Sequence, residues 1–189
     1  MDGIAWAGSA MVAARCRLEI AAENLANAST DGFARIVARG RLTAAGVRID
    51  READRRPGAF RRTGRDLDFA IAGEGAFTVR DRLGRIATTR NGAFVRERDG
   101  TLSDARGRTL LDRNRTAVRL ADGGTLDARR LGLPRGSRLC AGFLETSGAD
   151  AVGAMVDVMN AQRSFESAEK VVSAIDRTRE KSADEARVH

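Results

Sequence analysis

Carboxylates are the acid–base groups that this sequence supplies in number, and Asp66, Asp68 and Glu74 lie close together in its middle. Paired carboxylates can act as general acid and base, but each of these has arginines within a few residues, as Arg65 precedes Asp66. Turn capping and surface ion pairs account for such a pattern, and no spacing marks one carboxyl as buried with a raised pKa. The cluster therefore predicts no catalytic site.

The other chemical groups are scarce. His189 is the single histidine and there is no tyrosine, which argues against Ser-His-Asp and Cys-His triads and histidine-ligated zinc. Cys16 and Cys140 form no CxxC motif and are interpreted as small hydrophobic residues, with one disulfide as the alternative. Residues 73–75, Gly-Glu-Gly, lack the rest of a phosphate loop. We expect no enzyme, no catalytic or metal site, no cofactor and no small-molecule substrate, although an unrecognised carboxylate enzyme stays as a minor alternative.

Arginine dominates the charge of the chain. There are 33 basic and 26 acidic residues, a net charge of +7, and only two of the basic residues are lysines. The excess lies in residues 51–140, which carry +9, whereas residues 1–50 carry +1 and residues 141–189 carry −3. A basic middle between nearly neutral or acidic ends indicates that the ends and the middle have different roles.

Nucleic-acid binding is the first function that a basic middle suggests, because arginines can neutralise phosphates. Proteins that bind single strands also need exposed aromatic rings for stacking, and only 4% of this chain is aromatic. The sequence carries no helix-turn-helix, zinc-finger or RNA-binding signature. Nucleic acid is therefore disfavoured as a partner, and an arginine-rich nucleic-acid-binding protein stays as an alternative.

A seven-residue apolar repeat predicts a helix at the start of the chain. This helix covers about 25 residues and should end within residues 27–32, where polar side chains compete with the backbone before a glycine. Asn24 and Asn27 near its end either cap or cross-link backbones or only stop the helix. Apolar residues at a and d positions form a stripe that suits a partner helix. They are Ile4, Met11, Leu18, Leu25, Ala7, Ala14, Ala21 and Ala28.

The end of the chain predicts a second, longer helix. Residues 147–150 offer a cap, and the periodic stretch that follows covers about 30 residues or more, which indicates a coiled-coil arrangement. The polar tail from residue 181 is expected to fray. The apolar residues are predicted to line one face. They are Val152, Met155, Val158, Met159, Phe165, Ala168, Val172 and Ile175.

Between the helices the apolar period changes to two, which predicts short antiparallel strands. Asn91-Gly92 and Asp99-Gly100 supply the positive φ of tight hairpin turns. Residues 34–58 show no clear period and are predicted to be a linker or extended arm. The strand-like runs cover residues 69–72, 76–79, 85–89 and 93–95.

These elements predict an α+β fold, in which the N- and C-terminal helices pair as a coiled-coil-like assembly core beside a central antiparallel β-rich domain. Helices that only pack on the β domain are the alternative. No run of 18 apolar residues predicts a membrane span, and residues 1–17 lack the positive start of a cleaved signal peptide. The predicted parts are an N-terminal assembly helix (1–33), the linker or arm (34–58), the β-rich domain (59–146) and a C-terminal assembly helix with its tail (147–189).

Residues 18–33, LEIAAENLANASTDGF, resemble the N-terminal signature of bacterial flagellar rod and hook axial proteins, in which Asn-Leu-Ala-Asn leads into Thr-x-Gly-Phe. Residues 155–172 resemble the C-terminal helix of that family. Residues 63–71, 75–77 and 89–94 resemble its middle. Within the family, the GRDLD of residues 64–68 is most similar to the proximal rod subunit that adjoins the distal rod.

The resemblance implies a structural subunit of the flagellar basal-body rod, which polymerises through its terminal helices across the periplasm and helps to transmit torque from motor to hook. Its partners would be itself, other rod subunits and the type III flagellar export apparatus, which exports it without a cleaved signal and without membrane insertion. A distal rod or hook-type axial protein is the alternative. The expected assembly interface comprises Ile4, Met11, Leu18, Leu25, Asn24, Asn27, Met155, Met159, Gln162, Phe165 and Val172.

Overall fold

The computed structural model describes residues 3–44, 46–54, 56–121 and 124–187, with side chains over residues 5–180 of these ranges. Two helices flank a central antiparallel β-rich region, so the predicted α+β class is confirmed. The chain forms two compact units. Unit 1 comprises Met1–Ala28, Ile36–Asp54 and Ala149–His189, and unit 2 comprises Ser29–Arg35 and Arg55–Gly148.

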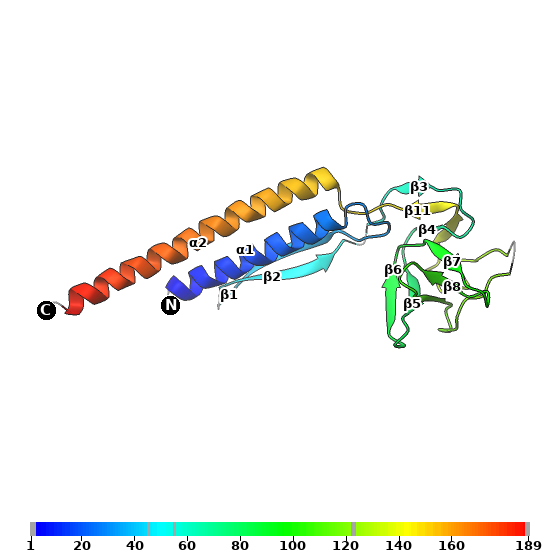
Figure 1. The fold of residues 1–189 in the computed structure, drawn as a ribbon, viewed down its shortest axis with the longest axis horizontal. Coiled ribbons are helices and arrows are strands. Elements are labelled where there is room, and N and C mark those ends of the chain that lie inside the picture. Colours follow the sequence, from blue (N-terminus) through cyan, green and yellow to red (C-terminus); the bar gives the residue numbers. More distant parts are fainter. Residues whose placement is uncertain (1–2, 45, 55, 122–123, 188–189) are drawn as a thin grey trace. The chain divides into compact units, whose positions relative to one another are not determined.

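Unit 1 is built on two antiparallel helices, α1 (Gly3–Ala26) and α2 (Ala151–Arg187), which lie side by side in Figure 1. Alanine fills eight of the 24 positions of α1, which favours the helix and lets neighbours approach closely on two sides. The helix ends at Ala26, one residue before the stretch 27–32 in which its end was predicted. Asp150 caps α2, because its Oδ2 accepts a hydrogen bond of 2.6 Å from the Gly153 N–H.

A β-hairpin packs along α1 in the same unit. Strands β1 (Ile36–Thr43) and β2 (Gly46–Ala53) pair from Ile36 opposite Ala53 to Thr43 opposite Gly46. Ser9 Oγ on α1 accepts a hydrogen bond from the Val47 N–H at 3.2 Å, and a Cβ at Gly46 would collide with that oxygen. The segment 34–58, expected as a linker or extended arm, is therefore largely a hairpin that the helix holds in place.

Unit 2 holds short strands that pair in antiparallel fashion throughout. One sheet has the order β6-β5-β9-β8-β7, and two further pairs are β10-β4 and β11-β3. The strands are β3 (Phe60–Arg62), β4 (Phe69–Ala72), β5 (Phe77–Arg80), β6 (Ile86–Thr89), β7 (Phe94–Arg96), β8 (Leu102–Asp104), β9 (Thr109–Leu111), β10 (Arg138–Ala141) and β11 (Phe143–Glu145).

The core of unit 2 forms around three phenylalanine rings. The Phe77 and Phe94 rings meet edge to face with centroids 5.2 Å apart, and Phe69 lies 6.5 Å from Phe94. Other fully buried members include Ile71, Val79, Leu102, Leu110 and Val118. These inward positions alternate along β5, as the period of two predicts.

Three turns of unit 2 share one design, in which an aspartate accepts backbone N–H groups two and four residues later. Asp81 does so from Leu83 and Arg85, Asp104 from Arg106 and Arg108, and Asp112 from Asn114 and Thr116, all at 2.8–2.9 Å. The fourth position has positive φ in each turn. It is Gly84 (80°), Gly107 (71°) and Arg115 (61°).

Replacing Arg115 by glycine should therefore stabilise the protein. Left-handed backbone costs a non-glycine residue about 1–2 kcal/mol, partly offset by the greater freedom of glycine in the unfolded chain, so we expect a gain of about 0.5–1 kcal/mol. Urea unfolding of Arg115→Gly measures it. Gly84→Ala is the matched control, because a Cβ there meets nothing within 4 Å, and it should destabilise by a similar amount. A loss of stability in Arg115→Gly would contradict the argument.

Candidate assembly interface

The expected apolar assembly residues of α1 lie on the side that faces α2, whereas Asn24 bonds to the hairpin. The opposite side faces the hairpin, as Ser9 and Glu23 show by their bonds to Val47 and Arg51. Met11, Leu18 and Leu25 are half-buried on the α2 side, together with the buried Ala14 and Ala21. Ile4 belongs to α1, but its side chain lies outside the described residues.

Asn24 cross-links two backbones. Its side chain is buried, its Nδ2 donates to the Ile36 carbonyl at 2.8 Å, and its Oδ1 accepts from the Ile36 N–H at 2.8 Å. The amide thus replaces a neighbouring strand at the first residue of β1. Asn27 acts differently, because its Nδ2 donates at 2.9 Å to the Glu23 carbonyl at the end of α1, which also accepts the backbone N–H of Asn27 at 3.1 Å.

The prediction of one apolar face on α2 is wrong for Val152, Met155 and Met159, which are exposed, whereas the other five predicted residues lie on the side that faces α1. The side that faces α1 consists of residues spaced alternately by four and three, all buried or half-buried. They are Ala154, Val158, Ala161, Phe165, Ala168, Val172 and Ile175. Phe165 and Val172 belong to this row, but Met155, Met159 and Gln162 do not. The buried alanines fill the inner row because small side chains let two helices approach closely, and the sequence interpretation missed Ala154 and Ala161.

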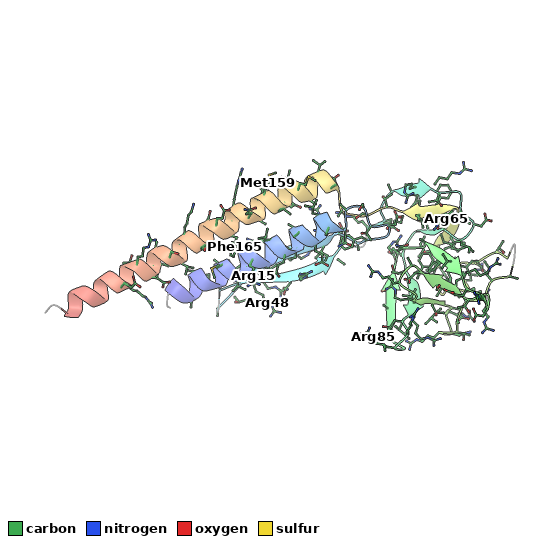
Figure 2. The ribbon with its side chains drawn as sticks, viewed as in Figure 1. Arg15, Arg48, Arg65, Arg85, Met159 and Phe165 are labelled. Atoms are coloured by element: carbon green, nitrogen blue, oxygen red, sulfur yellow. The ribbon has the colours of Figure 1, made fainter. Side chains whose placement is uncertain are left out.

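An apolar row remains on the outer side of α2. Val152, Met155, Val156 and Met159 follow the i, i+3, i+4, i+7 spacing of one helix face and are 45–70% exposed. At about 100° per residue this row lies roughly opposite the inner one. Figure 2 labels a member of each, Met159 outside and Phe165 inside. We call these four residues the outer row.

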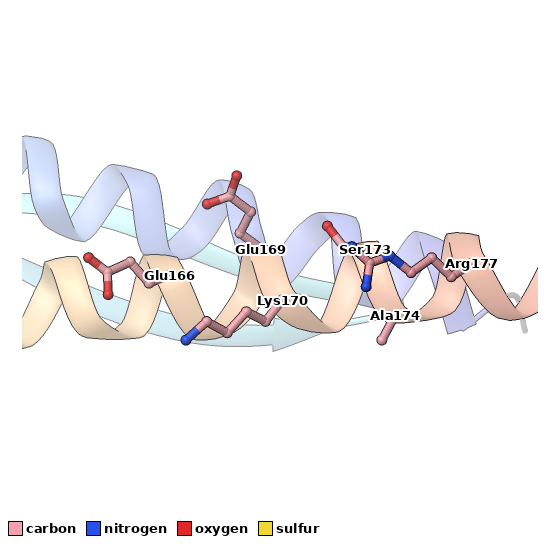
Figure 3. Close-up of a pocket in the computed structure, with 6 residues that line it drawn as sticks. All are labelled: Glu166, Glu169, Lys170, Ser173, Ala174 and Arg177. Carbon is pink, nitrogen blue, oxygen red and sulfur yellow. The ribbon is translucent and has the colours of Figure 1, made fainter.

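A depression on α2 is lined by Glu166, Glu169, Lys170, Ser173, Ala174 and Arg177 (Figure 3). All six come from one helix and all are exposed, with two acidic residues followed along the helix by two basic ones. Such a surface lacks the enclosed, mainly apolar wall of a ligand site. Among the described residues no cluster of three or more His, Cys, Asp or Glu could hold a metal ion, and both cysteines are free thiols. No described helix is long and apolar enough to cross a membrane.

Unit 2 is held by a buried ion pair, Arg90 with Glu145. Arg90 Nε lies 2.6 Å from Glu145 Oε2, and the two side chains are 12% and 5% exposed. The guanidinium also donates to the carbonyls of Ile71, Gly73 and Gly75. Glu145 Oε1 accepts from the Gly58 N–H at 2.9 Å. The pair thus ties β11 to the loops that follow β4 and β6.

A second buried carboxylate is Asp68, which is 1% exposed and pairs with Arg65 through two hydrogen bonds. Burial raises the pKa of Asp68, but the hydrogen bonds from Arg65 and Thr63 and the charges of Arg65 and Arg61 outweigh it, so the pKa lies below its ordinary value. Asp68, one of the three carboxylates that the sequence analysis considered, is therefore part of a turn and stays ionised at neutral pH.

Asp68 should make unit 2 sensitive to acid. Because its folded-state pKa is lower than the unfolded value of about 3.9, its stabilisation is present above that value and is lost as the pH falls through the folded pKa. We expect Asp68→Asn to be less stable than the wild type at pH 7, with a gap that closes between about pH 4 and the folded pKa. Urea unfolding at pH 7, 5, 4 and 3 tests this. A gap that stays constant over this range would contradict it.

Three family models match the chain in order. Residues 4–33 match the model described as flagella basal body rod protein, and residues 70–132 match that of the flagellar hook protein FlgE/F/G D1 domain. Residues 141–185 match the model described as flagellar basal body rod FlgEFG protein C-terminal. The search of curated proteins returned no match. Both helices and most of the β-rich middle fall within these matches, so the chain belongs to the flagellar rod and hook family, whose members are structural components of the flagellar axis.

Proposed function

We propose that the chain is a subunit of the basal-body rod, which polymerises through its terminal helices and helps to transmit torque from motor to hook. The outer row of α2 is the observation that carries this proposal. α1 already covers the inner face of α2, so the outer row has no cover within unit 1, in the part that the structure describes. Contiguous exposed apolar side chains are typical of protein interfaces.

The outer row fits a neighbouring copy or another axial subunit. A contact between this row and a different surface of the neighbour is head-to-tail, and such contacts generate open helical filaments when the rotation does not close. Met155 and Met159 would touch the neighbour, with Gln162 at the border of the row. Met11, Leu18, Leu25, Phe165 and Val172 would hold the helix pair of each subunit together.

The rod assignment includes export through the type III flagellar apparatus and a place in the periplasm. It is supported by two matched models whose descriptions name the basal body rod. The middle model is described as a hook protein domain, so a hook-type subunit is the second candidate. Immunogold labelling of isolated hook–basal bodies separates the two, because label along the rod supports the proposal and label confined to the hook contradicts it.

Met159→Glu tests the outer row directly. We expect the purified variant to unfold like the wild type, because the side chain is half-exposed, but to be absent from isolated basal bodies in cells that carry it as their only copy. A charge in an apolar contact must be desolvated, which costs several kcal/mol per contact.

Asn160→Glu is the matched control for this test. It places the same carboxylate on the next residue, about 100° around the helix and outside the outer row, and should assemble and support swimming. Normal swimming with Met159→Glu, or equal failure of both variants, would overturn the proposed role of the outer row.

A further inference from the structure

One end of the five-stranded sheet of unit 2 is more basic than the other. The turns 81–85 and 104–108, with the adjoining strand residues 80 and 86, hold five arginines and two aspartates. The turns 97–101 and 112–116, with the adjoining strand residue 96, lie at the opposite end of the same sheet and hold four arginines and three acidic residues. One end therefore carries +3 and the other +1. We call residues 80–86 and 104–108 the arginine end.

The strand register brings the two turns of the arginine end together. Arg80 at the end of β5 lies opposite both Ile86 on β6 and Thr109 on β9, and Thr109 also lies opposite Ser103 on β8. The Arg82 side chain reaches across to the second turn, because its Nη2 lies 3.5 Å from the place of a Cβ on Gly107. The arginines of both turns thus share one surface.

The aspartates of these turns do not cancel that charge at the surface. Asp81 and Asp104 are recessed, each accepts two backbone N–H groups, and they pair with Arg85 and Arg108 at 2.7 Å. Arg82 and Arg106, both exposed, have no ion-pair partner among the described residues. Rigid turns therefore present two uncompensated guanidinium groups to a partner.

An apolar side chain lies among the arginines. Leu83, at the tip of the first turn, is 78% exposed, and Ile86 beside it is about half-exposed. Apolar contact bordered by arginine is typical of protein interfaces, where arginine is enriched. Base stacking would instead need exposed aromatic rings, and residues 80–86 and 104–108 contain none.

We propose that the arginine end docks on an acidic protein surface, with Arg82 and Arg106 bound to Asp or Glu carboxylates of the partner and Leu83 in contact between them. Guanidinium groups bind carboxylates through two parallel hydrogen bonds, which fixes orientation as well as charge. The arginine end shares no residue with the outer row of α2. The proposed contact therefore does not depend on whether the subunit belongs to the rod or to the hook.

The test uses the full chain and labelled poly-L-glutamate of about 50 residues as the acidic probe, with binding followed by fluorescence anisotropy at about 50 mM NaCl. We expect the wild type to bind, and the double variant Arg82→Glu/Arg106→Glu to bind about tenfold more weakly or worse. The matched control is Arg98→Glu/Arg113→Glu, which changes the net charge equally at the opposite end of the sheet and should alter affinity less than about threefold. Circular dichroism confirms that both variants fold.

Three results would overturn the proposal. The first is a wild type that does not bind poly-L-glutamate. The second is an equal loss in both double variants, which would show that total charge alone acts. The third is a wild type that binds duplex DNA or phosphatidylglycerol vesicles of matched charge more tightly than poly-L-glutamate, while only Arg82→Glu/Arg106→Glu loses that affinity. The surface would then select phosphates over carboxylates.

Discussion

Arg90→Met should lower the free energy of unfolding of unit 2 by about 3–5 kcal/mol, the largest effect on stability that we expect from a single substitution. The change removes the positive member of a buried ion pair and leaves Glu145, which is 5% exposed, without its counter-charge. The carbonyls of Ile71, Gly73 and Gly75 lose their donor at the same time. Buried acceptors without partners add to the loss.

The measurement must report on unit 2 alone. The single tryptophan, Trp6, lies in α1 of unit 1, so its fluorescence does not follow unit 2. Amide hydrogen exchange at Phe77 and Leu110 does, because both are fully buried in the unit 2 core. Arg85→Met is the matched control. Arg85 also pairs with an aspartate, Asp81, but the Arg85 side chain is exposed to solvent, so its loss should cost much less stability than that of Arg90.

The double variant Arg90→Met/Glu145→Gln separates two causes of the instability, the lost contacts of the Arg90 side chain and the buried Glu145 carboxylate without a counter-charge. Glutamine keeps an oxygen that can accept from the Gly58 N–H, and it carries no charge to desolvate. We expect the double variant to recover at least half of the stability that Arg90→Met loses. A double variant as unstable as the single one would contradict the role of the unpaired carboxylate.

The two helices and the core strands follow from local pattern. The alanine-rich repeat of α1 and the competing polar residues after it predict a helix that ends at Ala26 within a few residues. The runs 69–72, 76–79 and 93–95 predict β4, β5 and β7, and each places a phenylalanine in the core of unit 2. The spacing of apolar residues and the residue types of turns are local properties of the chain, so they can be identified in a single sequence.

The hairpin of unit 1 was not predicted, because its inward positions are small. Ile36, Ala38 and Gly40 alternate with outward residues along β1, but alanine and glycine give little hydrophobic contrast. Gly40 is small because the Arg17 guanidinium of α1 lies against it. The alternation becomes visible only once the helix is known to cover that face.

The site could be predicted in part. The α1 stripe lies toward α2, as its spacing indicates. On α2 the sequence analysis chose the larger Met155 and Met159, which lie in the exposed outer row, and missed the buried Ala154 and Ala161. Helix periodicity alone does not decide which of two apolar rows is covered, because that depends on the partner's shape. Arg90 and Glu145 are 55 residues apart, and no local spacing connects them.

Asn24→Leu should lower the free energy of unfolding of unit 1 by about 2–4 kcal/mol, since it strands the Ile36 N–H and carbonyl at a cost of about 1–3 kcal/mol each. Leucine has the same number and branching of side-chain heavy atoms as asparagine, so the lost hydrogen bonds dominate over packing. Trp6 fluorescence during urea unfolding reports on this unit. Faster hydrogen exchange of the Ile36 amide gives a second, local readout.

Two further variants show that the effect belongs to the paired hydrogen bonds of Asn24. In Asn24→Asp the carboxylate can still accept from the Ile36 N–H, but it cannot donate to the Ile36 carbonyl and repels it, so we expect a loss comparable to that of leucine at neutral pH. Asn27→Ala removes one half-exposed hydrogen bond at the end of the same helix and should cost less than about 1.5 kcal/mol. If Asn24→Leu costs no more than Asn27→Ala, and both lose less than about 1.5 kcal/mol, the paired hydrogen bonds of Asn24 do not hold the hairpin to α1 and the prediction is contradicted.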